Sequence, residues 1–244
     1  MNEHLIVYVD TLGTKDAIKS SDETKTAALI ELLNRAASLR GESDLRTEAV
    51  GMFNLSHLRP AVSTFSDHIV MSYPTEDLHR VDKRDGLGSG LLFARNEIAL
   101  LAAAAMNDGF LIRGGATVGP LYHAGGVVLG PAMVEAYELE SRHAMYPRIA
   151  VSRKLYDRVK FEPRIQVLLT DHDRITHLNY FTEMVLRSNQ IEESRAVWLD
   201  KARKIMEKNI ARFERKERWN ELGKWVWFEK QLEQASKNAA PLIV

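Results

Sequence analysis

The chain has 244 residues, of which 45 % are hydrophobic and 27 % charged, proportions typical of a globular protein with a full hydrophobic core. Its 33 Lys and Arg residues balance its 33 Asp and Glu residues, so no overall field draws the chain to nucleic acid or to a membrane, and an anionic ligand needs a local site. The absence of cysteine excludes disulfides and thiolate metal sites, and it fits a cytoplasmic location.

The N-terminal sequence MNEHLIVYVD lacks the basic region and the long apolar stretch of a signal peptide. No apolar run approaches the ~20 residues that a membrane-spanning helix needs. We therefore expect a soluble protein that binds neither a membrane nor nucleic acid.

The first half of the chain predicts six regular elements. An apolar, β-branched run that stops at Asp10 is typical of a buried strand, and the cluster Ser20-Ser21-Asp22 is typical of a helix start. In chain order the patterns predict a strand at 5–9, a turn at 11–15, a helix from about 23, strands at 61–65 and 68–73, a helix at 91–106 and a strand at 110–118. The glycines at 86, 88 and 90 are interpreted as a flexible loop.

This β-α-β-β-α-β order predicts the ferredoxin-like plan, in which the first and third strands lie side by side and antiparallel at the sheet centre. Asp10 ends the first strand, and Asp67 begins the third. We therefore expect these two carboxylates, distant in sequence, to meet at one edge of the sheet.

The rest of the chain predicts a hairpin at 121–126, a helix at 131–142, strands at 148–151 and 165–169, and charged helices from about residue 190. All four tryptophans lie in this last region, which we expect to pack on the core or on a second subunit. The predicted division is a catalytic domain at 1–185 and a C-terminal helical appendage at 186–244.

Two carboxylates at adjacent strand ends form a hard-oxygen site that suits Mg²⁺ or Mn²⁺. Two such ions can hold the attacking and leaving oxygens of an in-line displacement at phosphorus. Backbone amides between Thr11 and Lys15, including those of Gly13 and Thr14, are candidates to bind triphosphate oxygens, and Lys15 is a candidate to add a positive charge.

Simpler interpretations stay open for single residues. An Asp at a strand end commonly caps the turn that follows it. Strand alternation predicts that His68 points to the face opposite Asp67. Gly114 and Gly115 interrupt a strand and predict a close backbone approach or a bulge.

Three segments resemble the catalytic domain of class III adenylate and guanylate cyclases. VYVDTLGTK resembles the first metal-binding segment with Asp10, and TFSDHIV resembles the hairpin that carries Asp67. The third segment is IRGGATVGPLYHAGGVVLGPAMVEAYELES followed by RIAVSRKLYDRV, which resembles the family's glycine-punctuated block. The resemblance covers about residues 5–155 and implies two metal ions, Mn²⁺ or Mg²⁺, held by Asp10, Thr11 and Asp67.

Departures from the family pattern refine this expectation. Val134 stands at the usual helix asparagine, and Glu138 stands at the usual transition-state arginine. Ser63 and Val127 stand where adenylate cyclases carry the lysine and the aspartate that bind adenine, which disfavours an adenine-specific enzyme.

The altered block resembles the pyrimidine cyclases of bacterial Pycsar anti-phage systems. That resemblance implies a homodimer with active sites at the interface, UTP or CTP as substrate, and a cyclic nucleotide product sensed by a separate effector. Ser63 and Phe65 are candidates to line the base pocket, and Tyr137 is a candidate to stack on the base. Candidate cations for the transition state are Arg113, Arg142 and Arg148, each of which also has a structural or surface interpretation.

Two alternatives stay open. One keeps the cyclase chemistry but uses GTP or several bases. The other is a degenerate cyclase-like module that binds a nucleotide or a partner and signals by dimerisation.

Overall fold

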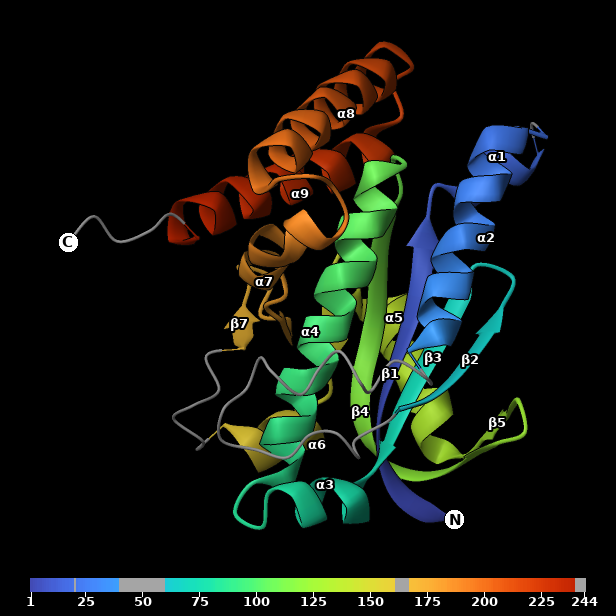
Figure 1. The fold of residues 1–244 in the computed structure, drawn as a ribbon, viewed down its shortest axis with the longest axis vertical. Helices are drawn as coiled ribbons and strands as arrows, with labels where there is room; N and C mark the ends of the chain where they lie inside the picture. The colour runs from blue at the N-terminus through green and yellow to red at the C-terminus, as the bar shows by residue number, and fades with distance from the viewer. Residues whose placement is uncertain (20, 40–59, 161–166, 240–244) are drawn as a thin grey trace.

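The computed structural model describes residues 1–19, 21–39, 60–160 and 167–239, and it contains a mixed eight-stranded sheet. The strand order is β2-β3-β1-β4-β6-β8-β7, with β5 paired to β4 outside this path. The strands are β1 (Asn2–Leu12), β2 (Ala61–Phe65), β3 (His68–Pro74), β4 (Leu111–Ala124), β5 (Val127–Leu129), β6 (Ile149–Val151), β7 (Leu168–Thr170) and β8 (Thr176–Leu178). The neighbours β2-β3-β1-β4 confirm the predicted α/β fold with a ferredoxin-like core (Figure 1).

Helices cover both faces of this sheet. They are α1 (Thr14–Lys19), α2 (Glu23–Ser38), α3 (Thr75–Val81), α4 (Gly86–Asn107), α5 (Pro131–His143), α6 (Arg153–Val159), α7 (Phe181–Arg187), the 3-10 helix η2 (Ser188–Gln190), α8 (Arg195–Arg215) and α9 (Trp219–Asn238). The predicted start of α2 is confirmed, since the Asp22 side chain accepts a hydrogen bond from the Lys25 backbone N–H. Ser20 of the predicted capping cluster and residues 165–166 of the predicted strand lie outside the described residues.

Alternation along β1 divides the core into two layers. The odd-numbered apolar residues of β1 pack with α2 and α4, whereas Ile6 and Tyr8 pack with Ala132 and Ala136 of α5. Asp10 has the same parity as Ile6 and Tyr8, so its side chain starts on the α5 side of the sheet.

Helix α4 corrects the loop interpretation of the glycines at 86, 88 and 90. The helix begins at Gly86, with Asp85 accepting a hydrogen bond from the Gly88 N–H. A Cβ at Gly86 would lie 2.6 Å from the His79 backbone nitrogen, and one at Gly90 would lie 2.6 Å from the Leu78 side chain. Gly86 and Gly90 therefore allow α3 to pack closely against α4. This contact lies between two helices, so the local sequence pattern does not indicate it.

Among the described helices, α4 is also the one that is long and apolar enough to cross a membrane by length and composition. In its most apolar window, 72 % of the residues are buried inside the fold. Its apolar residues therefore serve the protein core.

The predicted close approach at Gly114 and Gly115 is confirmed. A Cβ at Gly114 would lie 2.1 Å from the Tyr8 carbonyl oxygen, and one at Gly115 would lie 2.1 Å from the Ala136 carbonyl oxygen. Gly114 therefore allows the close approach of β4 to the β1 backbone, and Gly115 allows the close approach of β4 to α5. Both follow Arg113 directly in β4.

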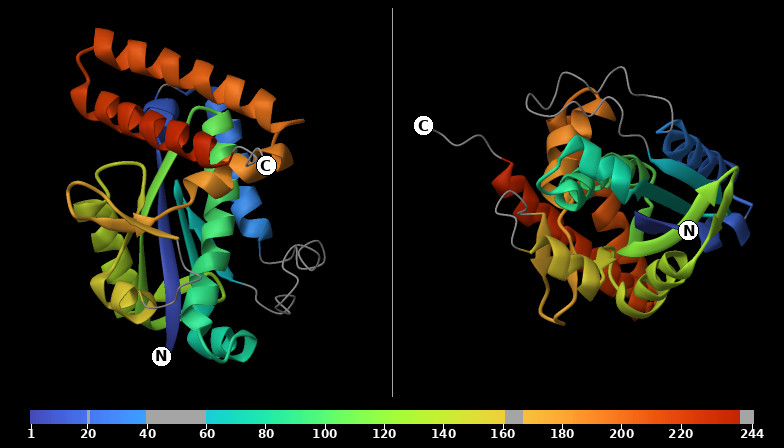
Figure 2. Two further views of the ribbon diagram at one scale, coloured as in Figure 1. Left: turned by 90° about the vertical axis from the view of Figure 1, so that its left-hand side faces the viewer. Right: turned by 90° about the horizontal axis from the view of Figure 1, so that it is seen from below.

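The C-terminal helices α8 and α9 lie across one end of the sheet, above the end of β1 (Figure 2). Three of the four tryptophans are buried, as expected of packing residues, and the Trp198 indole donates to the Ala103 carbonyl of α4. Trp219 differs, because it is 63 % exposed.

Candidate metal and nucleotide site

The antiparallel register places Asp10 between two polar side chains. Asp10 pairs directly with His68 of β3 on one side and with Arg113 of β4 on the other. Residues directly opposite each other across a strand pair point to the same face of the sheet. The Asp10 carboxylate accordingly lies 3.4 Å from His68 Nδ1 and 3.0 Å from Arg113 Nε.

Asp67 reaches the same place from the β2–β3 turn. Its carbonyl accepts a hydrogen bond from the Thr11 N–H at 3.1 Å, which ties the turn to the end of β1. Its carboxylate accepts hydrogen bonds from the Thr14 hydroxyl at 2.5 Å and the Ser66 hydroxyl at 3.0 Å. Burial opposes ionisation, but these bonds and the neighbouring His68 hold the pKa of Asp67 below its usual range.

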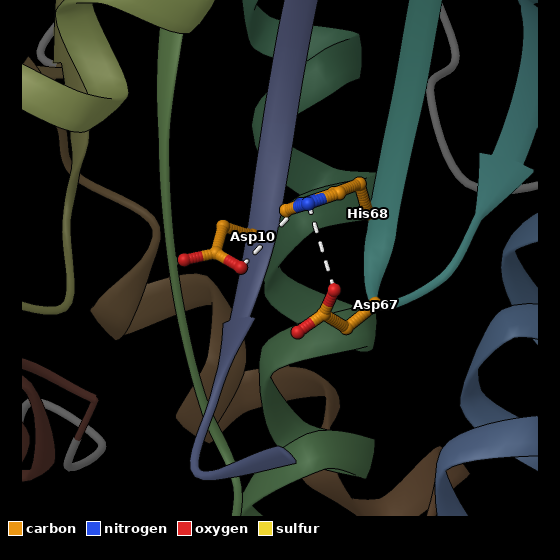
Figure 3. Close-up of side chains that lie close together, drawn as sticks. All are labelled: Asp10, Asp67 and His68. Carbon is orange, nitrogen blue, oxygen red and sulfur yellow. Dashed lines mark ion pairs between the residues drawn. The ribbon is translucent and has the colours of Figure 1, made fainter. Parts of the chain in front are cut away.

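The expectation that His68 points away from Asp67 is wrong (Figure 3). Asp67 lies in the turn that precedes β3, so strand alternation does not extend to it, and the register with Asp10 sets the direction of His68. His68 Nε2 lies 3.5 Å from the Asp67 carboxylate.

These three side chains fit a divalent ion. Asp10, Asp67 and His68 each offer one ligand atom, and these atoms lie within 4.8 Å of one another. The buried Thr11 Oγ1 has no hydrogen-bond partner among the described residues, but alternation along β1 directs it to the face of the sheet opposite Asp10. Two carboxylates and an imidazole suit Mg²⁺ or Mn²⁺.

Arg113 also contacts a buried acid. Its Nη2 lies 2.6 Å from Oε1 of Glu140 in α5, and Glu140 is only 3 % exposed to solvent. Burial raises the pKa of Glu140 to about 7, with a further contribution from the Asp10 carboxylate, although Arg113 acts in the opposite direction.

This raised pKa predicts a pH dependence of stability in the metal-free protein. The folded state binds the Glu140 proton more tightly than the unfolded state, so the free energy of unfolding is expected to fall as the pH rises from about 4.5 to about 7. Glu140→Gln should remove this contribution. Urea unfolding with a chelator across that pH range tests the expectation, and an unchanged slope in the variant would contradict it.

A cavity of about 450 Å³ adjoins the two aspartates. Of the residues predicted to bind metal or substrate, it collects the following: Asp10, Thr11, Gly13, Thr14, Lys15 and Asp67. The predicted turn at 11–15 is shorter than expected, since β1 runs to Leu12, Gly13 adopts a φ of +96°, and α1 begins at Thr14.

The three residues predicted to contact the base lie outside this cavity. The buried Ser63 hydroxyl lies 2.9 Å from His123 Nε2. Phe65 is 48 % exposed with its ring 5.2 Å from that of His68, and Tyr137 is 52 % exposed and edge-on to Tyr8.

The other candidate cations are engaged elsewhere. Arg148 is fully buried and pairs with Asp171 at 3.1 Å and with Asp173. Arg142 is exposed and pairs with Glu138 at 3.0 Å. Their structural and surface interpretations are confirmed.

Comparison with known proteins yields only weak likenesses. No family model and no curated protein matches the chain. Among solved structures, two structures of a bacterial light-regulated adenylyl cyclase match 80 % of the chain, with TM-scores of 0.37 and 0.36 and identities of 18 % and 16 %. The matches span 98 % and 56 % of those chains. Likenesses this weak assign no function.

Proposed function

We propose that this protein is a metal-dependent nucleotide cyclase that converts UTP or CTP into the 3′,5′-cyclic monophosphate and pyrophosphate. The observation that carries the proposal is the convergence of Asp10, Asp67 and His68 beside a cavity of about 450 Å³. That volume lies in the roughly 300–1,000 Å³ range of ligand pockets.

The chain's own groups have distinct tasks in this reaction. Asp10 and Asp67 would hold two Mn²⁺ or Mg²⁺ ions, with His68 as a further ligand. Thr11, which lines the same cavity, stays a proposed ligand. When bound, such ions supply Lewis acidity at phosphorus and favour ionisation of a hydroxyl. Thr14 keeps the Asp67 carboxylate oriented and ionised through its hydrogen bond.

In the proposed reaction the ribose 3′ hydroxyl gives its proton to solvent water, and its oxygen attacks the α-phosphorus. The new bond closes the ring as the bond from the α-phosphorus to the bridging oxygen breaks, and pyrophosphate leaves with its electron pair. Arg113 Nε donates to the Asp10 carboxylate, so this guanidinium lies beside the proposed ion site and is the candidate cation for the charge that develops on the phosphates.

The environment of Ser63 argues against an adenine-specific site. Its hydroxyl already contacts His123 and the Gly126 carbonyl, and Val127 is 54 % exposed and apolar, so neither position offers the paired charged groups that would bind adenine. Separate incubations with the four ribonucleoside triphosphates and Mn²⁺ test this proposal. Cyclic UMP or cyclic CMP is the expected product, whereas cyclic GMP or cyclic AMP would overturn the base assignment alone.

A homodimer is supported by exposed apolar side chains on the α5 side of the sheet. They lie on the β4–β5 hairpin and on α5: Tyr122, Val127, Leu129, Val134 and Tyr137. Large exposed apolar groups that gather beside a site are typical of an interface. A dimer through this surface would bring Phe65 and Tyr137 of each subunit near the partner's site.

The double variant Leu129→Glu and Val134→Glu is expected to convert the dimer into a monomer, because it buries two uncompensated charges in the interface. Light scattering coupled to size exclusion measures the mass. Ile30→Glu is the matched control, since Ile30 is 54 % exposed on α2. A wild-type monomer, or a double variant that stays dimeric, would contradict the proposed interface.

The cyclic product would act in the cytoplasm as a second messenger on a separate effector in anti-phage defence.

One observation favours a second candidate function, a metal-free binding module: Arg113 already neutralises Asp10. Tight nucleotide binding without turnover in Mn²⁺ would favour that module.

A further inference from the structure

The C-terminal helices form one wall of the cavity at the two aspartates. Asn209, Arg212 and Phe213 line it from α8, at a spacing that places them on one helix face. Glu221, Lys224 and Trp225 line it from α9 with the same spacing. This wall faces the loop that follows β1, which lines the opposite side.

Arg218, the residue before α9, links this wall of the cavity to α1. Its guanidinium donates to Asp16 of α1 at 2.7 Å and to Glu221 at 2.5 Å. Both acids therefore pair directly with Arg218, and Glu221 acts on Lys224 without an ion-pair contact.

Lys224 of this wall lies close enough to Asp10 for the two charges to interact. The half-buried Lys224 forms no ion-pair contact with any described residue, although the charges of Glu221, Asp10 and Glu140 act on it. Burial lowers the pKa of its amine, and the Arg113 guanidinium lowers it further. An ammonium group held in a cavity without a direct partner is suited to bind an anionic ligand.

We propose that Lys224, assisted by Arg212, binds the phosphate chain of the nucleotide, so that the C-terminal helices complete the active site. This inference rests on the proposed function for the class of substrate. A triphosphate keeps negative charge after it has bound the two ions that the aspartates hold. Lys224 and Arg212 line the same cavity from the C-terminal helices and can contact that charge.

The test measures binding of inorganic triphosphate in excess Mg²⁺ by isothermal titration calorimetry, so that neither base nor turnover contributes. Lys224→Gln is expected to weaken binding about tenfold, which corresponds to about 1.4 kcal/mol. Lys224→Arg should retain most of the affinity. Lys230→Gln is the matched control, because Lys230 is exposed on the same helix outside the cavity.

Each result decides the proposal separately from cyclase activity. Absence of triphosphate binding by the wild type, or equal affinities of Lys224→Gln and Lys230→Gln, would overturn it. Lys224-dependent binding without a cyclic product from any nucleotide would support this inference and overturn the proposed function. If Lys224→Gln fails to fold, the affinities of Lys224→Arg and Arg212→Gln for triphosphate are compared instead. The loss of affinity is expected to be larger in Arg212→Gln than in Lys224→Arg. The reverse order would overturn the assignment.

Discussion

Asp67→Asn is expected to reduce cyclic nucleotide formation by about 100-fold to 10,000-fold, because a catalytic metal contributes several kcal/mol to transition-state stabilisation. Asparagine keeps the size of the side chain but loses the charge that holds the ion. The Asp67 side chain is only 21 % exposed but lies in a turn. Thr14 and Ser66 donate to its two different oxygens, so the amide oxygen of asparagine keeps one of these two hydrogen bonds. The fold should therefore survive.

Initial rates of product formation in saturating Mn²⁺ measure this effect. Asp77→Asn is the matched control, because Asp77 lies on the surface of α3 and, among the described residues, its ion pair is with the exposed Arg80. A folded Asp67→Asn protein with the activity of Asp77→Asn would contradict the assignment of the metal site.

Arg148→Ala is expected to lower the free energy of unfolding by about 3–5 kcal/mol, the usual effect of removing one partner from a buried ion pair. Arg148 is fully buried and bonds to Asp171, Asp173 and the His143 carbonyl. Its removal leaves two carboxylates without their cation between β6 and the β7–β8 turn.

Urea unfolding measures the loss, and Arg142→Ala is the control. Arg142 pairs with Glu138 on an exposed helix face, so its removal should change stability by less than about 1 kcal/mol. Equal stabilities of the two variants would contradict the structural role of Arg148.

The meeting of Asp10 and Asp67 was predictable because strand order and antiparallel direction follow from hydrophobic pattern and connection length. The direction of His68 was not, because it depends on a register of β3 against β1 that a one-residue shift would reverse. The start of α4 was missed for a related reason: Gly86 and Gly90 are set by contacts with α3.

The contribution of α9 to the cavity has no local signal at all. The charged and aromatic composition of the tail predicts helices that pack, and Trp225 and Trp227 do so. Nothing in that pattern indicates that Lys224 lies near Asp10, more than 200 residues away in sequence, because only the docking of α9 over the end of β1 brings them together. The division at residue 185 stays a prediction.

One measurement tests the central claim most directly: incubation of the wild-type protein with Mn²⁺ and UTP, and in a second reaction with Mn²⁺ and CTP, with the products identified by mass spectrometry and phosphate analysis. The account predicts the 3′,5′-cyclic monophosphate and pyrophosphate in equal amounts from UTP or from CTP, with both products abolished by a chelator. Linear UMP with pyrophosphate, or UDP with phosphate, would contradict it, because water and not the ribose hydroxyl would then be the nucleophile.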